Sequence, residues 1–178
     1  MTCSDTAIAD LKVIDFFSNE DKRGVFVKTF HRSAFKNLGI DFELKESFYS
    51  TSIKDTIRGM HFHMPPHEHT KIVFCIDGSI LDVALDLRKE SLTYGQYFTI
   101  ELNSLHHKAL YIPKGFAHGF ATLSEAATTF YFVDGEYHAA SDQGIRFDSF
   151  GLEWSIHNPL LSERDLQFQT FSQFQSPF

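Results

Sequence analysis

Histidines gather in one short segment of the chain, RGMHFHMPPHEHTK, at residues 58–71. Four histidines and one glutamate fall within nine positions of it: His61, His63, His67, Glu68 and His69. Neutral imidazole is both a common metal ligand and a common general base near neutral pH. The segment therefore predicts either a metal site or a proton-transfer site, and the fold must decide which of these side chains meet.

The composition of the chain predicts one globular domain at residues 1–178. Of the 178 residues, 43% are hydrophobic and 20 are Phe, which is enough large apolar material to fill a sizeable core. The formal net charge is -7 and no cluster of Lys and Arg occurs, whereas proteins that bind nucleic acids usually present a basic face. Nucleic acid is therefore not an expected partner.

The number of cysteines and the N-terminal residues predict the cellular location of the protein. The two cysteines, Cys3 and Cys75, are too few for a disulfide framework or a cysteine zinc site. The N-terminus lacks a basic segment followed by an apolar stretch, and no apolar run approaches the ~20 residues that cross a bilayer. We expect a cytoplasmic protein without a membrane partner.

Alternating apolar residues predict short β-strands along most of the chain. The clearest case is KIVFCIDGSILDVALDLR, residues 71–88, in which Asp77-Gly78 predicts a tight hairpin turn between two strands. In the second strand Val83, Leu85 and Leu87 alternate with Ala and Asp, so one face should lie against the core. Further strand-like runs occupy residues 95–102, 107–113 and 127–137. This pattern indicates an all-β sandwich or barrel.

Helical patterns are confined to two places. Residues 31–39 predict a short helix that Gly39 ends. A second helix should begin after Ser162, a plausible N-cap, with Asp165 at the third helical position of a capping box. The Phe-rich tail that follows, residues 168–178, is expected to dock by its aromatic side chains.

The histidine segment can be interpreted as a metal site of the cupin type. Cupins are small jelly-roll barrels that often bind a metal through His-x-His, a Glu a few residues on, and a later His from a Pro-x-Gly-x-x-His turn. The corresponding residues here are His61, His63, Glu68 and, from PKGFAH, His118. They offer the nitrogen and oxygen ligands that Fe, Mn or Ni accept, although two prolines interrupt the strand that they require. The favoured alternative to ligation for His67 and His69 is that both are solvated loop residues.

Motifs along nearly the whole chain point to proton transfer instead. RGMHF, TKIVFCIDGSILDVALDLRKESLTYGQY, LYIPKGFAHGFATLSE, GIRFDSFGLEW and LSERD closely resemble the dTDP-4-dehydrorhamnose 3,5-epimerase family, from residue 21 to residue 165. The resemblance implies a cupin jelly-roll barrel with short peripheral helices, one of them near the C-terminus, and no catalytic metal or other cofactor. It also implies the epimerisation of a nucleotide-linked 4-keto-6-deoxyhexose in deoxysugar biosynthesis.

The resemblance assigns the catalytic roles. His61 would remove a proton beside the ketone, and Asp165 would orient the imidazole and favour the imidazolium that forms, as in other His–Asp pairs. Tyr131 would donate a proton on the opposite face of the sugar, which favours protonation at C5. Lys71 would stabilise the enolate near the C4 carbonyl.

The same resemblance implies a substrate-binding set. Its members would lie near the diphosphate, the nucleotide or the sugar: Arg23, Phe26, Glu46, Ser50, Arg58 and His118. Asp82 would orient His118 or support the barrel. The family forms homodimers in which an N-terminal strand joins the partner's sheet, so residues near Arg23 and Phe26 are expected to reach the neighbouring site.

Departures from the family pattern leave the substrate open. His63 replaces a usual Gln, and Lys28 follows RGVFV, whereas the family commonly has a Glu shortly after this segment. A Gln-x-Asn-x-Ser pattern of the family has become Glu46, Phe48 and Ser50. CDP- and GDP-linked 4-keto sugars therefore compete with the dTDP sugar, and C3, C5 or both could be inverted. Two other functions also stay open: a metal-dependent cupin isomerase or dioxygenase, and a sugar-nucleotide-binding cupin without catalysis.

Overall fold

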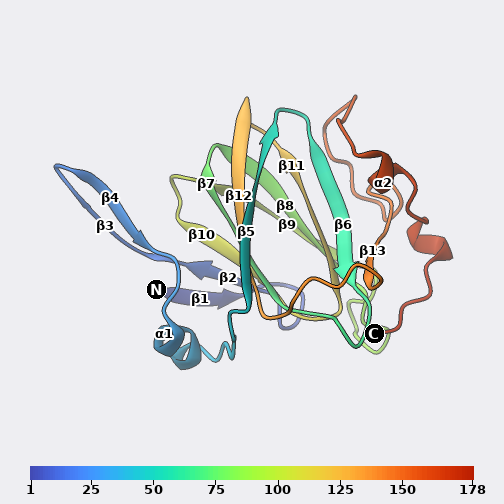
Figure 1. Ribbon diagram of the computed structural model, residues 1–178, viewed down its shortest axis with the longest axis horizontal. Helices are drawn as coiled ribbons and strands as arrows, with labels where there is room; N and C mark the ends of the chain where they lie inside the picture. The colour runs from blue at the N-terminus through green and yellow to red at the C-terminus, as the bar shows by residue number, and fades with distance from the viewer.

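The computed structural model describes residues 1–178 as two facing β-sheets with a projecting hairpin and short peripheral helices (Figure 1). In sheet order, the larger sheet contains β1 (Thr2–Asp5), β2 (Lys12–Asp15), β10 (Lys108–Ile112), β7 (Lys71–Asp77), β12 (Ala126–Val133) and β5 (Glu46–Ile53). The smaller sheet contains β13 (Asp142–Gly144), β6 (Ile57–His63), β11 (Phe116–Thr122), β8 (Ser79–Asp86) and β9 (Tyr97–Asn103). All pairings between these strands are antiparallel. The predicted all-β architecture is confirmed.

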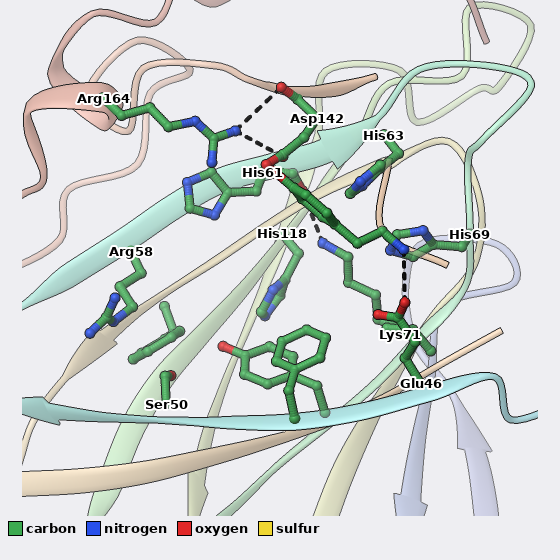
Figure 2. A pocket seen from close by; sticks show the side chains of 15 residues that line it. Glu46, Ser50, Arg58, His61, His63, His69, Lys71, His118, Asp142 and Arg164 are labelled. Carbon is green, nitrogen blue, oxygen red and sulfur yellow. Dashed lines mark hydrogen bonds and ion pairs between the residues drawn. The ribbon is translucent and has the colours of Figure 1, made fainter. Parts of the chain in front are cut away.

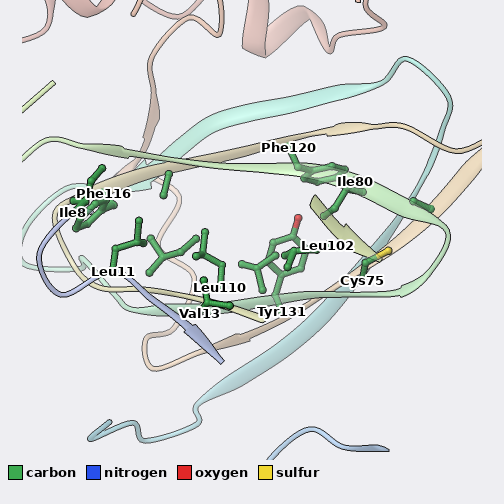
Figure 3. Packing of buried hydrophobic residues seen from close by; sticks show 14 residues of the cluster. Ile8, Leu11, Val13, Cys75, Ile80, Leu102, Leu110, Phe116, Phe120 and Tyr131 are labelled. Carbon is green, nitrogen blue, oxygen red and sulfur yellow. The ribbon is translucent and has the colours of Figure 1, made fainter. Parts of the chain in front are cut away.

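Alternation along the strands separates two layers of core. Ile80 and Ala84 of β8 and Phe120 of β11 face the larger sheet, where they pack with residues such as Leu110 and Tyr131 (Figure 3). The intervening Val83 and Leu85 face the other way and pack under the C-terminal segments with Trp154 and Phe174. The predicted docking of the tail by its Phe residues is thus confirmed, since Phe171 and Phe178 join the same cluster.

The turn at Asp77-Gly78 is not a hairpin. β7 and β8 both fall within the predicted run at residues 71–88, although β8 ends at Asp86, before Leu87. They lie in different sheets, β7 beside β10 and β12, and β8 beside β9 and β11. Only Gly78 takes a positive φ there, 73°, and a Cβ on it would lie 2.1 Å from the carbonyl oxygen of Ala126. The dipeptide provides the sharp turn that the sequence predicted, but it carries the chain from one sheet to the other.

Both predicted helices are present and short. α1 spans Arg32–Asn37 and buries Phe35, and α2 spans Glu163–Leu166. Ser162 caps α2 because its side chain accepts a hydrogen bond from the backbone N–H of Asp165, at 3.1 Å. A 3₁₀ turn, η1, follows at Phe171–Gln173. None of these helices has the length and apolarity needed to cross a membrane.

The remaining pair of strands forms an arm that projects away from the two sheets (Figure 1). β3 (Phe17–Asp21) and β4 (Gly24–Lys28) pair only with each other. The arm carries large apolar side chains that are exposed to solvent: Phe17, Val25 and Phe26 are each about half exposed.

Candidate active site

A cavity of about 420 Å³ opens between the two sheets, on the side of β5, β6, β7, β11 and β12 (Figure 2). Its lining consists of Glu46, Phe48, Ser50, Arg58, His61, His63, His69, Lys71, His118, Phe120, Tyr131, Val133, Tyr137, Asp142 and Arg164. Eight of the ten residues proposed from the sequence as catalytic or substrate-binding are here or touch a lining residue. The exceptions are Arg23 and Phe26.

Strand pairing explains why residues so distant in sequence meet. Side chains two apart on a strand share a face, so β5 presents Glu46, Phe48 and Ser50 in one row. In the register of the larger sheet Tyr131 lies opposite Phe48, and Val133 lies opposite Lys71. In the smaller sheet His118 lies opposite His61. The cavity therefore receives side chains from both sheets.

His61 and Asp165 form the first of two His–Asp pairs. The imidazole Nε2 lies 2.7 Å from Asp165 Oδ1, and the other carboxylate oxygen accepts a hydrogen bond from the Gly59 backbone N–H at 3.3 Å. Burial alone would raise the pKa of Asp165, but the hydrogen bonds and the neighbouring imidazole lower it below its usual value. An ionised Asp165 accepts from Nε2–H, which leaves the Nδ1 lone pair of His61 without a protein partner.

Asp165 thus does not complete the predicted capping box. Its backbone N–H is capped by Ser162, but its carboxylate points to His61 and Gly59 rather than back to the N-cap backbone. The cap still matters to the site, because it fixes the first turn of α2 and with it the position of this carboxylate.

His118 and Asp82 form the second pair, deeper between the sheets. Nε2 of His118 lies 2.8 Å from Asp82 Oδ1, as anticipated for an orienting carboxylate. Burial lowers the pKa of His118 despite the attraction of Asp82, so the imidazole is neutral at neutral pH. The second oxygen of Asp82, Oδ2, is buried without a hydrogen-bond partner.

Tyr131 contributes a phenol from the sheet opposite His61. Burial, together with the charge of Asp82, raises the pKa of Tyr131 above its usual value, so its hydroxyl keeps its proton across the neutral range. The ring meets His118 edge-on, with centroids 5.9 Å apart, and is stacked against Phe48, with centroids 4.7 Å apart. A protonated donor therefore stands across the cavity from a free imidazole nitrogen.

Lys71 and Arg58 add positive charge to the lining of the cavity. The Lys71 ammonium donates to the backbone carbonyl of His61 at 3.3 Å, and burial lowers the pKa of Lys71 to about 8. It is still mostly charged at pH 7. Arg58 donates from Nε to Ser52 Oγ at 2.9 Å and from Nη2 to the Thr51 backbone carbonyl at 3.5 Å. Because no carboxylate neutralises it, its positive charge is available to an anion.

Several lining residues were not recognised from the sequence. His69 was expected to be a solvated loop residue, which is wrong: it lines the cavity, and burial lowers its pKa to about 3. Its ring centroid lies 4.5 Å from that of His63. Arg164 forms an ion pair with Asp142 at 2.8 Å. The position of Arg164 beside Asp165 in LSERD was the one available signal for it.

Figure 2 shows Arg58 and Glu46 at opposite ends of the cavity. Glu46 accepts a hydrogen bond from the backbone N–H of Tyr137 at 3.0 Å. One end is therefore cationic, whereas the other carries a carboxylate and two neutral imidazoles, those of His63 and His69. Two of the sequence departures, Glu46 and His63, fall together at this second end.

Arg23 and Phe26 do not reach this cavity. Both lie on the projecting arm, where Phe26 is exposed and Arg23 forms an ion pair with Asp21 at 2.6 Å. The arm points away from its own sheets (Figure 1), so these residues do not contribute to the cavity of their own chain.

The proposed metal ligands do not assemble. No group of three or more His, Cys, Asp or Glu side chains is arranged to hold a metal ion. His61 and His118 each use one ring nitrogen on a carboxylate, and Glu68 does not line the cavity. His67 instead stacks on His138, with ring centroids 3.6 Å apart. These residues therefore do not fit the ligand set of a metal-dependent cupin.

Comparison with known proteins agrees with the geometry. The family model for dTDP-4-dehydrorhamnose 3,5-epimerase matches residues 5–173. The chain is 35% identical to the dTDP-4-dehydrorhamnose 3,5-epimerase of Shigella flexneri over 169 residues, 93% of each chain. It is 34% identical to a dTDP-4-dehydrorhamnose 3-epimerase of Streptomyces niveus over 148 residues, 82% of this chain and 72% of the relative.

A solved structure extends the similarity to the fold. The dTDP-6-deoxy-D-glucose-3,5-epimerase of Legionella pneumophila, in complex with dTDP-4-keto-L-rhamnose, superposes with a TM-score of 0.93 and 30% sequence identity. The match covers 98% of this chain and 94% of that chain. This agreement confirms the expected jelly-roll architecture.

Proposed function

Because this chain belongs to the dTDP-4-dehydrorhamnose 3,5-epimerase family, we propose that it inverts C3 and C5 of a dTDP-linked 4-keto-6-deoxyhexose. The family makes it a sugar-nucleotide epimerase, which is an isomerase. One observation carries the proposal: the free Nδ1 side of His61, the protonated Tyr131 phenol and the Lys71 ammonium surround a single cavity. Such an arrangement suits proton removal from one face of a ring and proton return to the other.

The first step is removal of the proton beside the ketone. The C4 carbonyl acidifies the hydrogens on C3 and C5, because the electron pair left behind is delocalised onto its oxygen. His61 takes the proton on Nδ1 and becomes an imidazolium. Asp165, held at 2.7 Å from Nε2, stabilises that charge and keeps the ring in the tautomer that leaves Nδ1 free.

The second requirement is stabilisation of the enolate oxygen. Lys71 lines the cavity, and its ammonium is held beside the proposed base by a hydrogen bond to the backbone carbonyl of His61. A fixed positive donor stabilises the enolate more than the neutral ketone, and one such donor typically contributes 10²–10³-fold in rate.

The third step returns a proton to the opposite face. Tyr131 donates its phenolic proton to the carbon, the enolate collapses to the ketone, and the phenolate recovers a proton from solvent. His61 releases the proton that it removed to solvent as well. The carbon is inverted, and no proton or electron is gained or lost overall.

His118 and Arg58 are proposed to hold the substrate. Because His118 is neutral and donates from Nε2 to Asp82, its Nδ1 can accept a hydrogen bond from a sugar hydroxyl. Arg58, free of carboxylate partners, suits the diphosphate. Ser50 lies beside it in the lining.

The altered end of the cavity, opposite Arg58, bears on which sugar is bound. Glu46 places a carboxylate where the family commonly has an amide, and His63 replaces another amide. A site built to pair with one set of polar groups discriminates strongly against another. A differently substituted 4-keto sugar therefore competes with the dTDP-linked 6-deoxyhexose, and CDP- and GDP-linked 4-keto sugars are the other competing substrates.

The projecting arm supports a homodimer. Its exposed Phe17, Val25 and Phe26 would be covered if β3 and β4 lay on a second copy. Arg23 and Phe26 would then complete the neighbouring site. Loss of the dimer in an Arg23→Ala, Phe26→Ala variant, measured by light scattering, would accompany a raised KM.

Proton NMR of the purified protein with dTDP-4-keto-6-deoxyglucose in D₂O tests the proposed function. We expect loss of the C3 and C5 proton signals and the appearance of the inverted product, both insensitive to EDTA. Exchange at one carbon would restrict the enzyme to a single-site epimerase, and exchange only with CDP or GDP sugars would change the substrate. Loss of activity with EDTA would revive the metal-dependent alternative, and binding without exchange with any sugar would leave a non-catalytic binding protein.

A further inference from the structure

Phe48 lies directly against the proposed acid. It stands opposite Tyr131 in the register of β5 and β12, and the two rings are stacked with centroids 4.7 Å apart and planes 19° apart. Residues directly opposite on neighbouring strands have the closest Cβ atoms of a sheet. The contact is therefore a direct consequence of strand register.

Phe48 is too exposed to be a residue of the hydrophobic core. Its side chain is 46% exposed, whereas Tyr131 is 8% exposed. Phe48 belongs to none of the buried clusters, and it lines the cavity beside Ser50 and Glu46. It stacks on one face of the Tyr131 ring, and His118 meets that ring edge-on. Together the two neighbours limit how far the phenol can turn.

We infer that Phe48 is a positioning residue that holds the Tyr131 phenol over C5 and thereby sets how often C5 is inverted. This inference rests on the proposed function. The sequence indicates only that an amide has been lost at position 48, whereas in the structure the aromatic ring that replaces it stacks on the proposed acid.

The enolate offers a way to observe this positioning. Once His61 has removed the C5 proton, the carbon can be protonated from two sides. In D₂O, deuterium from His61 returns on the original face with retained configuration, whereas deuterium from Tyr131 arrives on the opposite face with inversion. Each event replaces one C–H bond by one C–D bond and restores the ketone. A misplaced phenol therefore lowers inversion without lowering exchange.

The test measures the ratio of inverted to retained deuterated product at C5, by NMR, in Phe48→Leu and Phe48→Ala. We expect this ratio to fall about tenfold in both variants, the size expected when an aromatic contact that fixes a reacting group is lost. Total exchange at C5 should stay within about threefold of wild type, because the His61–Asp165 pair is untouched. Phe48→Tyr should restore the ratio, since a ring can stack again.

The opposite face of the same strands provides a matched control. Tyr49 lies opposite Phe130 and stacks on it, with centroids 6.3 Å apart and planes 18° apart, but neither lines the cavity. Tyr49→Leu should leave the C5 ratio unchanged. An equal fall in Tyr49→Leu, or no fall in either Phe48 variant, would overturn the inference while leaving the proposed function intact. Absence of exchange in the wild type would instead remove the proposed function.

Discussion

Two His–Asp pairs share one cavity and differ mainly in exposure. His61 and Asp165 are 2.7 Å apart, and His118 and Asp82 are 2.8 Å apart. The His61 side chain is 30% exposed, whereas that of His118 is 4% exposed. In both pairs Nε2 faces the carboxylate, so both imidazoles present Nδ1 away from it.

Because of this difference in exposure, the two His–Asp pairs suit different chemical roles. A base must pass through a charged imidazolium, and the open side of the cavity allows His61 to exchange its proton with solvent. His118 is buried, its pKa is lowered, and one oxygen of its partner has no hydrogen bond. The buried pair therefore suits a fixed neutral hydrogen-bonding group, and the exposed pair suits proton transfer.

The largest expected effect is the loss of the exposed base. His61→Asn should lower deuterium exchange at C3 and C5 by about 10³-fold, within the range typical of a general base. His118→Asn, the matched change in the buried pair, should retain exchange within about tenfold and mainly raise KM. Initial-rate NMR in D₂O measures both. A larger loss in His118→Asn than in His61→Asn would reverse the assignment of the pairs.

The pH dependence of kcat tests the role of Lys71, the cation beside the His61–Asp165 pair. Burial lowers the pKa of Lys71 to about 8, so kcat should fall as pH rises through about 8 and the ammonium loses its charge. Lys71→Met should lower kcat about 10²-fold, and this high-pH limb should disappear. An unchanged limb in Lys71→Met would show that another group titrates there.

The smallest effect concerns stability in acid. The pKa of His118 is lowered in the folded protein, so below about 6.5 the unfolded chain binds a proton that the folded chain excludes. Stability should therefore fall as pH drops from about 6.5 toward the folded pKa, by up to about 1.4 kcal/mol per pH unit for this group. Urea unfolding at pH 7.5 and 5.5 measures the slope, which should be shallower in His118→Asn. An identical slope in that variant would contradict the assignment of a neutral buried imidazole.

Local sequence signals predicted where strands and helices lie better than they predicted which strands pair. Residue patterns that act over a few positions predicted the location of β7 and β8, the Ser162 cap and the docking of the Phe-rich tail. The Asp77-Gly78 turn shows the limit of such signals. A turn residue reports a change of chain direction, but the sheet that the next strand joins depends on packing across the whole domain.

In the candidate site, too, local motifs indicated single residues, whereas their contacts depend on the pairing of distant strands. Motif resemblance indicated His61, Tyr131 and Lys71, and strand register then brought them together. His69 was misjudged because its burial depends on β12 and the chain after it, which the histidine segment does not contain. The stacking of Phe48 on Tyr131 required the register of two strands about 80 residues apart in the chain.

The two-sided proton transfer is tested most directly by the stereochemistry of exchange in Tyr131→Phe. With dTDP-4-keto-6-deoxyglucose in D₂O, this variant should incorporate deuterium at C5 through His61 while the C5 configuration is retained. Deuterium with normal inversion would show that another group is the acid. The absence of any deuterium at C5, in a variant that still exchanges C3, would show that Tyr131 is needed to remove the proton and would contradict the roles assigned to both residues.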